Sequence, residues 1–295
     1  MTKKFPTIGL ALHSSKQMFS FPLGMGISIG LFVAMMVFFF GLFFILFADF
    51  DFAAMEAILN GELASLPAPR EPGDGGGVFV ALVPLLAIIS FIVGYAWIFN
   101  MWVRFGAFGR EGAFFKKPMQ GIGAAAITAL KMLFISLFLG IVALVALLAL
   151  AAFGLVSFDP SSIAEPTLAN AVMVNLVSMA VISGTYSLFS SNLTQTALGS
   201  DTEEVGPPHV FEFGIVLFIL NAALLLPLAI LQFYVPLVVV AIIQFIGSLW
   251  LMAAIPLAHG IRYDWQRQVF AGESAAEQFG LESDQAAPES DDENP

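Results

Sequence analysis

The sequence predicts an all-α, polytopic integral membrane protein with six transmembrane helices and short amphipathic helices at the membrane surface. Of its residues, 59% are hydrophobic and 11% are charged, whereas soluble domains carry about a quarter charged residues. The mean hydropathy is +0.90. Phe, Leu, Ile, Val and Ala form runs longer than a soluble core helix needs, and such runs match the hydrocarbon thickness of a bilayer.

Six apolar segments are long enough to cross a hydrocarbon layer of about 30 Å, which takes about 20 helical residues. We expect them at 24–47, 78–102, 126–156, 168–190, 213–231 and 235–258. Only Gln232, Phe233 and Tyr234 separate the last two, and Pro236 fits the first turn of a new helix. The chain then divides into a cytoplasmic amphipathic segment (1–23), a six-helix transmembrane domain (24–259) and an acidic cytoplasmic tail (260–295), which we expect to be disordered.

The distribution of basic residues predicts that both termini lie in the cytoplasm (N-in, C-in), because cytoplasmic loops collect Lys and Arg. In this orientation the outer loops hold only Arg70. The inner segments hold Lys3, Lys4, Lys16, Arg104, Arg110, Lys116, Lys117, Arg262 and Arg267. Lys131 falls in the first turns of the third span, where it can extend to the inner headgroups. The inner loop 191–212 is an exception, since it has no basic residue. The expected location is a bacterial inner membrane.

Two segments have the pattern of surface helices. Ile8, Leu12 and Phe19 alternate with polar residues before the first span, which predicts an amphipathic helix on the inner leaflet. Residues 52–66 predict a second one on the outer surface, followed by a Pro- and Gly-rich connector at 66–77. Aromatic residues at span ends anchor at the headgroups, so we expect Trp102, Tyr263 and Trp265 at the inner headgroup level.

The spans lack the residues of common membrane catalysis. Their middles contain no Asp, Glu, Lys or Arg, although pumps and intramembrane enzymes place such groups there. The chain has no cysteine, and His13, His209 and His259 all fall near the inner surface. We therefore predict no catalytic residue, no cofactor and no metal site.

The fourth span is the most polar and contains the candidate interior. Asn175, Ser178, Thr185, Tyr186, Asn192 and Thr196 share an arc of about 120° on a helical wheel. With Asn221 on the fifth span and Gln244 on the sixth, most of this stripe forms the candidate polar interior: Asn175, Ser178, Thr185, Tyr186, Asn192, Asn221 and Gln244. Two interpretations stay open, namely hydrogen bonding between helices and a polar cavity for a small neutral or amphipathic solute.

Two further patterns each have two interpretations. The inner loop 103–120 carries candidate contacts for anionic lipid headgroups, namely Arg104, Arg110, Lys116 and Lys117. The general preference for positive charge on the inner side explains the same residues. Gly26 and Gly30 form a GxxxG pair in the first span, which serves either packing within the chain or dimerisation.

Two short stretches, GLALHSSKQMFSFPLGMG before the first span and WVRFGAFGREG after the second, carry a resemblance. In them the chain resembles uncharacterised bacterial multi-pass membrane families related to the glycerophosphodiester phosphodiesterase membrane domain. The resemblance covers about a tenth of the chain. It implies a membrane-embedded helical domain and carries over no active-site residue, because the chain shows no phosphodiesterase domain.

These patterns favour a non-enzymatic membrane protein, acting as a scaffold, an assembly or accessory subunit, or a membrane-homeostasis factor. The alternative is a carrier or channel for a small neutral or amphipathic solute that uses the interior of spans four to six. The expected partners are the lipid bilayer and either another membrane protein or a second copy of the chain, with no nucleic acid.

Overall fold

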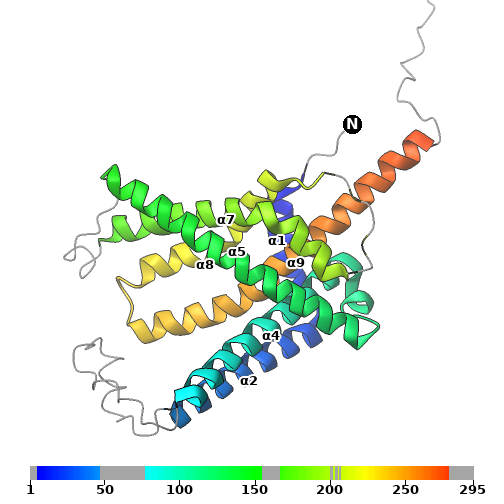
Figure 1. Cartoon of the computed structure of the whole chain (residues 1–295). Coiled ribbons are helices and arrows are strands. Elements are labelled where there is room, and N and C mark those ends of the chain that lie inside the picture. Colours follow the sequence, from blue (N-terminus) through cyan, green and yellow to red (C-terminus); the bar gives the residue numbers. More distant parts are fainter. Residues whose placement is uncertain are drawn as a thin grey trace, which may run out of the picture.

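The computed structural model describes residues 5–46, 77–154, 167–199, 202, 205 and 207–278. Within these ranges the chain is helical and contains no strand (Figure 1). The elements are α1 (Thr7–Gln17), the short 3-10 turn η1 (Met18–Ser20), α2 (Pro22–Leu46), α4 (Gly77–Gly112), α5 (Pro118–Ala152), α7 (Leu168–Leu198), α8 (Val210–Leu231) and α9 (Leu237–Gln278). Six of them, α2, α4, α5, α7, α8 and α9, are long and apolar enough to cross a membrane. The predicted all-α membrane fold is therefore confirmed.

Several helices extend well beyond one hydrocarbon thickness. α9 has 42 residues, which at 1.5 Å per residue make about 60 Å. It runs through positions 260–278, which the sequence assigned to the tail, because aromatic residues there still have packing partners. The indole of Trp265, for example, packs edge-on against Phe5 with ring centroids 5.2 Å apart. Residues 279–295 lie outside the described part of the chain.

The helices meet at one end of the bundle, here named the closed end. There Arg104 of α4 donates to the carbonyl of Leu198 at the end of α7, and Arg110 donates to the carbonyl of Ser20 just before α2. Phe5 and Trp265 bring the start of the chain and the far part of α9 to the same place. Both ends of the described chain thus lie at the closed end.

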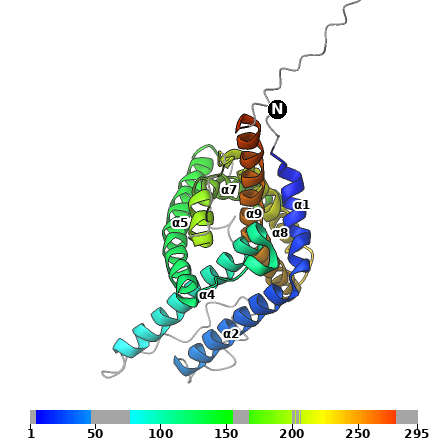
Figure 2. The ribbon, with the colours of Figure 1, turned by 90° about the vertical axis from the view of Figure 1, so that its right-hand side faces the viewer.

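α1 lies across the closed end, whereas the long helices run along the bundle (Figures 1 and 2). Leu10, Ala11 and Ser14 are buried, and the helix packs against α8 and α9. Its other face exposes Ile8 and Leu12, and Phe19 of η1 is exposed as well. This is the arrangement predicted for a helix on the membrane surface. The second predicted surface helix, 52–66, lies outside the described residues.

Two predicted headgroup anchors are inside the protein. Trp102 is fully buried, and its indole Nε1 donates to Ser28 Oγ of α2 at 2.9 Å. Tyr263 is 3% exposed. Neither side chain is therefore free to anchor in the headgroups, and the depth of these two residues in a membrane stays a prediction. They lie where α4 and α9 cross, and the helices continue past them toward the cytoplasmic side of the predicted topology.

Packing is sparse at the opposite end, here named the open end. Every residue of α9 from Leu237 to Ile246 is exposed except Val240. The outward row of α5 is exposed as well, including Leu137 and Leu144. In Figure 1 the α8–α9 hairpin stands apart from α2 and α4 at this end. The helices are therefore tightly packed at the closed end, whereas toward the open end fewer contacts join them, such as those of Phe32 with Phe245 and Phe39 with Phe91.

Candidate functional site

One face of α7 is polar and buried. Ser183, Ser187, Ser190 and Thr194 follow one another at spacings of four, three and four residues, so they share one side of the helix. Three of these hydroxyls donate to carbonyls of their own helix: Ser187 to Gly184 at 2.7 Å, Ser190 to Ser187 at 2.5 Å and Thr194 to Ser190 at 2.8 Å. A hydroxyl that donates once still accepts. The face therefore offers acceptor oxygens to α9.

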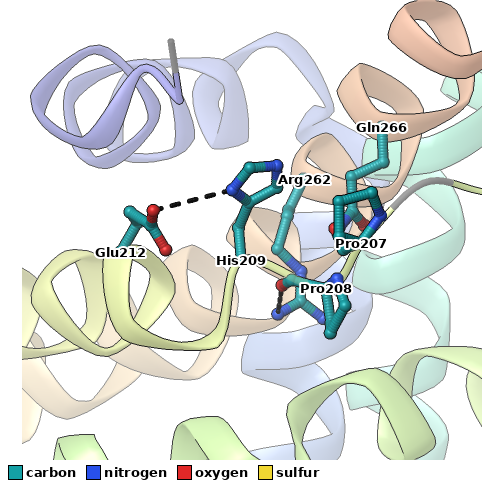
Figure 3. Close-up of polar contacts among 6 residues, drawn as sticks. All are labelled: Pro207, Pro208, His209, Glu212, Arg262 and Gln266. Atoms are coloured by element: carbon teal, nitrogen blue, oxygen red, sulfur yellow. Dashed lines mark hydrogen bonds and ion pairs between the residues drawn. The ribbon is translucent and has the colours of Figure 1, made fainter. Parts of the chain in front are cut away.

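Arg262 of α9 uses these acceptors. Its side chain is 1% exposed, and its Nη1 donates to Ser190 Oγ at 2.7 Å and to the Pro208 carbonyl at 3.4 Å (Figure 3). Its Nη2 donates to Thr194 Oγ1 at 3.4 Å, and the guanidinium carbon lies 4.1 Å from the centre of the Phe213 ring. Among the described residues, no carboxylate forms an ion pair with it. Neutral oxygens and a ring face hold this charge.

His259 lies one turn before Arg262 and is fully buried. Its Nδ1 is 2.9 Å from Thr194 Oγ1, and its Nε2 has no hydrogen-bond partner among the described residues. Three aromatic rings surround it edge-on, those of Phe99, Tyr186 and Phe213. No group of three or more potential ligands (His, Cys, Asp or Glu) occurs within the described ranges. Ser187, Ser190, Thr194, His259 and Arg262 are named the polar belt below.

The segment 207–209, directly before α8, lies against the polar belt. Gln266 Nε2 donates to the Pro207 carbonyl at 2.5 Å. His209 has a left-handed backbone (φ 44°), and its Nδ1 lies 3.6 Å from a carboxylate oxygen of Glu212 (Figure 3). Its ring stacks on Phe5 with centroids 5.2 Å apart. These contacts attach the segment to both α9 and the start of the chain.

Arg104 is a second buried guanidinium at the closed end. Its Nε donates to the Gly112 carbonyl at 3.0 Å and its Nη1 to the Leu198 carbonyl at 2.8 Å, while its guanidinium lies 4.1 Å from the Phe115 ring centre. It is 3% exposed. Arg104 is therefore not exposed in the way that the predicted contact with lipid headgroups requires. It connects the ends of α4 and α7 within the protein.

The other three predicted headgroup contacts, Arg110, Lys116 and Lys117, are exposed at the closed end. Exposure is what contact with lipid headgroups requires. Lys117 lies directly before the first residue of α5, and Lys116 precedes it. Whether these side chains bind lipid stays a prediction.

The structure does not gather the seven predicted interior residues. The amides of Asn175 and Asn221 donate to carbonyls of their own helices, at 2.9 Å and 2.8 Å. Asn192 and Gln244 are exposed, and Ser178 and Thr185 are half-buried. Tyr186 alone of the seven touches the polar belt, through the ring of His259.

The sequence contains a pattern that indicates the polar belt and that is distinct from the predicted stripe. Ser183, Ser187, Ser190 and Thr194 have the spacing of one helix face, and this face is a different one from the predicted stripe. His259 and Arg262 follow position 258, the predicted end of the sixth span, and the structure buries both inside the helix bundle. The aromatic residues that follow them, Tyr263 and Trp265, were the indication that α9 continues.

Comparison of the chain with family models, with curated proteins and with solved structures gives no match. The assignment of a function therefore depends on the geometry alone.

Proposed function

We propose that this chain is a non-enzymatic multi-pass protein of a bacterial inner membrane that acts as a scaffold or accessory subunit for another membrane protein. In this proposal the closed end faces the cytoplasm, because nine of the eleven basic residues belong to the predicted inner segments. The closed end is the rigid frame, and the open end is the surface that engages the partner.

One observation supports this role most directly, the exposure of Gln244 on the outer part of α9. Its amide has no hydrogen-bond partner among the described residues, and exposed apolar residues such as Ile243 and Ile246 lie beside it on α9. Gln244 is seven residues past Leu237, which is about 10 Å along the helix, so in the predicted topology the amide would lie within hydrocarbon. Lipid chains cannot satisfy it. A transmembrane helix of another protein can satisfy the Gln244 amide if it offers a hydrogen-bonding side chain. We propose that such a helix packs against this surface.

The geometry favours this function over a carrier. A carrier through spans four to six needs the polar groups of those spans to face a common interior. Asn175 and Asn221 instead bond to their own helices, and Gln244 lies on the outside of the bundle.

Site-specific photocrosslinking tests the proposal. A photoreactive residue at Ile246, 61% exposed on α9, should capture another membrane protein in cells, whereas one at Leu137, 59% exposed on α5, should capture little beyond lipid. Gln244→Leu should lower the yield of the Ile246 adduct about threefold, since a hydrogen bond between membrane helices contributes about 0.6 kcal/mol. Gln232→Leu, a change of the same kind in the turn after α8, is the control.

Two outcomes contradict the accessory role. Equal adducts from Ile246 and Leu137, unaffected by Gln244→Leu, mean that lipid alone covers α9. An adduct whose mass is twice that of the chain identifies a second copy as the occupant.

A further inference from the structure

A groove of about 460 Å³ lies between α5 and the closed end of α7. Most of its lining residues are apolar or glycine. Its polar groups are the amide of Gln120, the hydroxyl of Thr196 and the ammonium of Lys131. It is lined by Phe115, Gln120, Gly123, Ala124, Ile127, Lys131, Thr196 and Gly199. Gly123 contributes open space, because a Cβ built there would meet no atom within 4 Å.

Lys131 places a positive charge in this groove. Its Nζ donates to Thr196 Oγ1 at 2.5 Å and to the amide oxygen of Asn192. Both partners are neutral, and within the described ranges no carboxylate forms an ion pair with this ammonium. An ammonium has three donors, so one donor and the full charge remain for an anion.

The groove lies near the level of the membrane surface. Thr196 is two residues from Thr194, which contacts His259 in the polar belt. The polar belt in turn contacts the Pro208 carbonyl beside His209, which stacks on Phe5 just before the surface helix α1. With α1 on the membrane surface, as its exposed apolar side chains Ile8 and Leu12 predict, the Lys131 ammonium would lie at headgroup depth.

An exposed apolar row leads away from the groove. Ile127, Leu130 and Phe134 of α5 are 53%, 56% and 63% exposed, and their spacing puts them on one side of the helix. In a bilayer this row contacts acyl chains. A free phosphate would use the ammonium but not the row, whereas a phospholipid uses both.

We propose that the α5–α7 groove binds the headgroup of an anionic phospholipid, with its phosphate on Lys131 and its acyl chains along Ile127, Leu130 and Phe134. Gln120 provides an amide at the cytoplasmic side of the groove. This site is independent of the proposed accessory role, since it lies on α5 and α7 and not on the outer part of α9.

The test measures protection of the full chain in detergent against thermal unfolding. A ligand that binds the folded state raises the midpoint with its concentration. Phosphatidylglycerol, phosphatidylcholine and inorganic phosphate are added separately, and phosphatidylglycerol should protect most. Lys131→Gln should weaken the apparent affinity for phosphatidylglycerol about tenfold, as expected for the loss of one charge-assisted hydrogen bond.

Gly123→Leu is the second variant, because its side chain enters the groove without removing charge. Gly140→Leu is its matched control on the same helix, since a Cβ at Gly140 also meets no atom within 4 Å. Gly123→Leu should weaken binding of phosphatidylglycerol by as much as Lys131→Gln, and Gly140→Leu should leave it unchanged. If Lys131→Gln does not fold, the comparison of Gly123→Leu with Gly140→Leu tests the proposed site by itself.

Three results overturn the proposal. Phosphatidylcholine that protects as well as phosphatidylglycerol excludes selection for an anion. Inorganic phosphate that protects as well as phosphatidylglycerol makes the ligand a free anion and not a lipid. Binding that survives Gly123→Leu at the level of Gly140→Leu places the lipid elsewhere.

Discussion

At the scale of single residues, the unusual feature is a buried cation with neutral partners. Arg262 has hydroxyl and carbonyl oxygens and one aromatic face around it. Moving a charge out of water is costly, and such contacts offset that cost only in part. The long side chain also fills space between α7 and α8, so its packing and its charge act in opposite directions on stability.

Two substitutions at Arg262 separate these effects. Arg262→Ala leaves a cavity and should lower the free energy of unfolding by about 3 kcal/mol. Arg262→Met retains most of the volume without the charge and should cost about 1 kcal/mol or less. Unfolding in detergent measures both, with the exposed Lys117→Ala as a control expected within about 0.5 kcal/mol of the wild type. A methionine variant as unstable as the alanine variant would show that the hydrogen bonds, and not the packing, hold the site together.

The difference between the predicted and the observed interior also has its origin at single residues. A helical wheel places Asn175 and Thr185 on one arc but does not say whether an amide turns to its own backbone, as Asn175 does. Small hydroxyl side chains also contribute little to a polar stripe on such a wheel. Ser190 and Thr194 nevertheless accept hydrogen bonds from Arg262 of α9, and Ser187 lies at the close contact of α7 with Gly214 of α8, where a short side chain allows the helices to come near.

At the scale of elements, α4 and α9 cross in close contact at two glycines, Gly106 and Gly260. A Cβ on Gly260 would lie 2.0 Å from the Val103 carbonyl oxygen and 2.8 Å from the Gly106 Cα. Both neighbours are backbone atoms, which cannot rotate away. The crossing therefore depends on the absence of a side chain at these positions.

Gly260→Ala should separate α4 from α9 and lower the free energy of unfolding by about 3 kcal/mol, the upper range for overpacking. Gly140→Ala is the matched control, because its Cβ meets open space, and it should stabilise α5 by up to about 1 kcal/mol. Thermal unfolding of both variants in detergent provides the measurement. Equal midpoints of thermal unfolding for Gly260→Ala and Gly140→Ala would contradict the close crossing of α4 and α9.

The GxxxG pair of the first span behaves differently from this crossing. A Cβ on Gly26 or Gly30 would meet no atom within 4 Å. The pair is therefore not used for packing within the described chain, and dimerisation through it stays a prediction.

The existence of the elements was predictable, whereas their ends and their packing partners were not. Runs of apolar residues determine where a span exists, and all six expected spans have a helix. The extra length of α9 depends on contacts with α1, and those are long-range. Trp102 illustrates the same limit: its sequence position fits a headgroup anchor, but Ser28 of α2 accepts its N–H in the core.

At the scale of the whole molecule, the bundle has a tightly packed closed end and an open end with fewer contacts between helices. The closed end holds two buried guanidiniums, Arg104 and Arg262, and the cytoplasm is its proposed side. The open end holds the exposed outer part of α9. The proposed lipid site and the proposed partner surface lie at opposite ends, so each can be tested without the other.

The most direct test of the account is the topology, and the natural absence of cysteine makes it accessible. Single cysteines at Thr2, Ser200 and Ser274 should react with an impermeant thiol reagent only after the membrane is opened. Single cysteines at Ser65, Ser162 and Tyr234 should react in intact spheroplasts. Reaction of the Thr2 and Ser274 positions on opposite sides of the membrane would contradict six crossings and the proposed cytoplasmic side of the closed end.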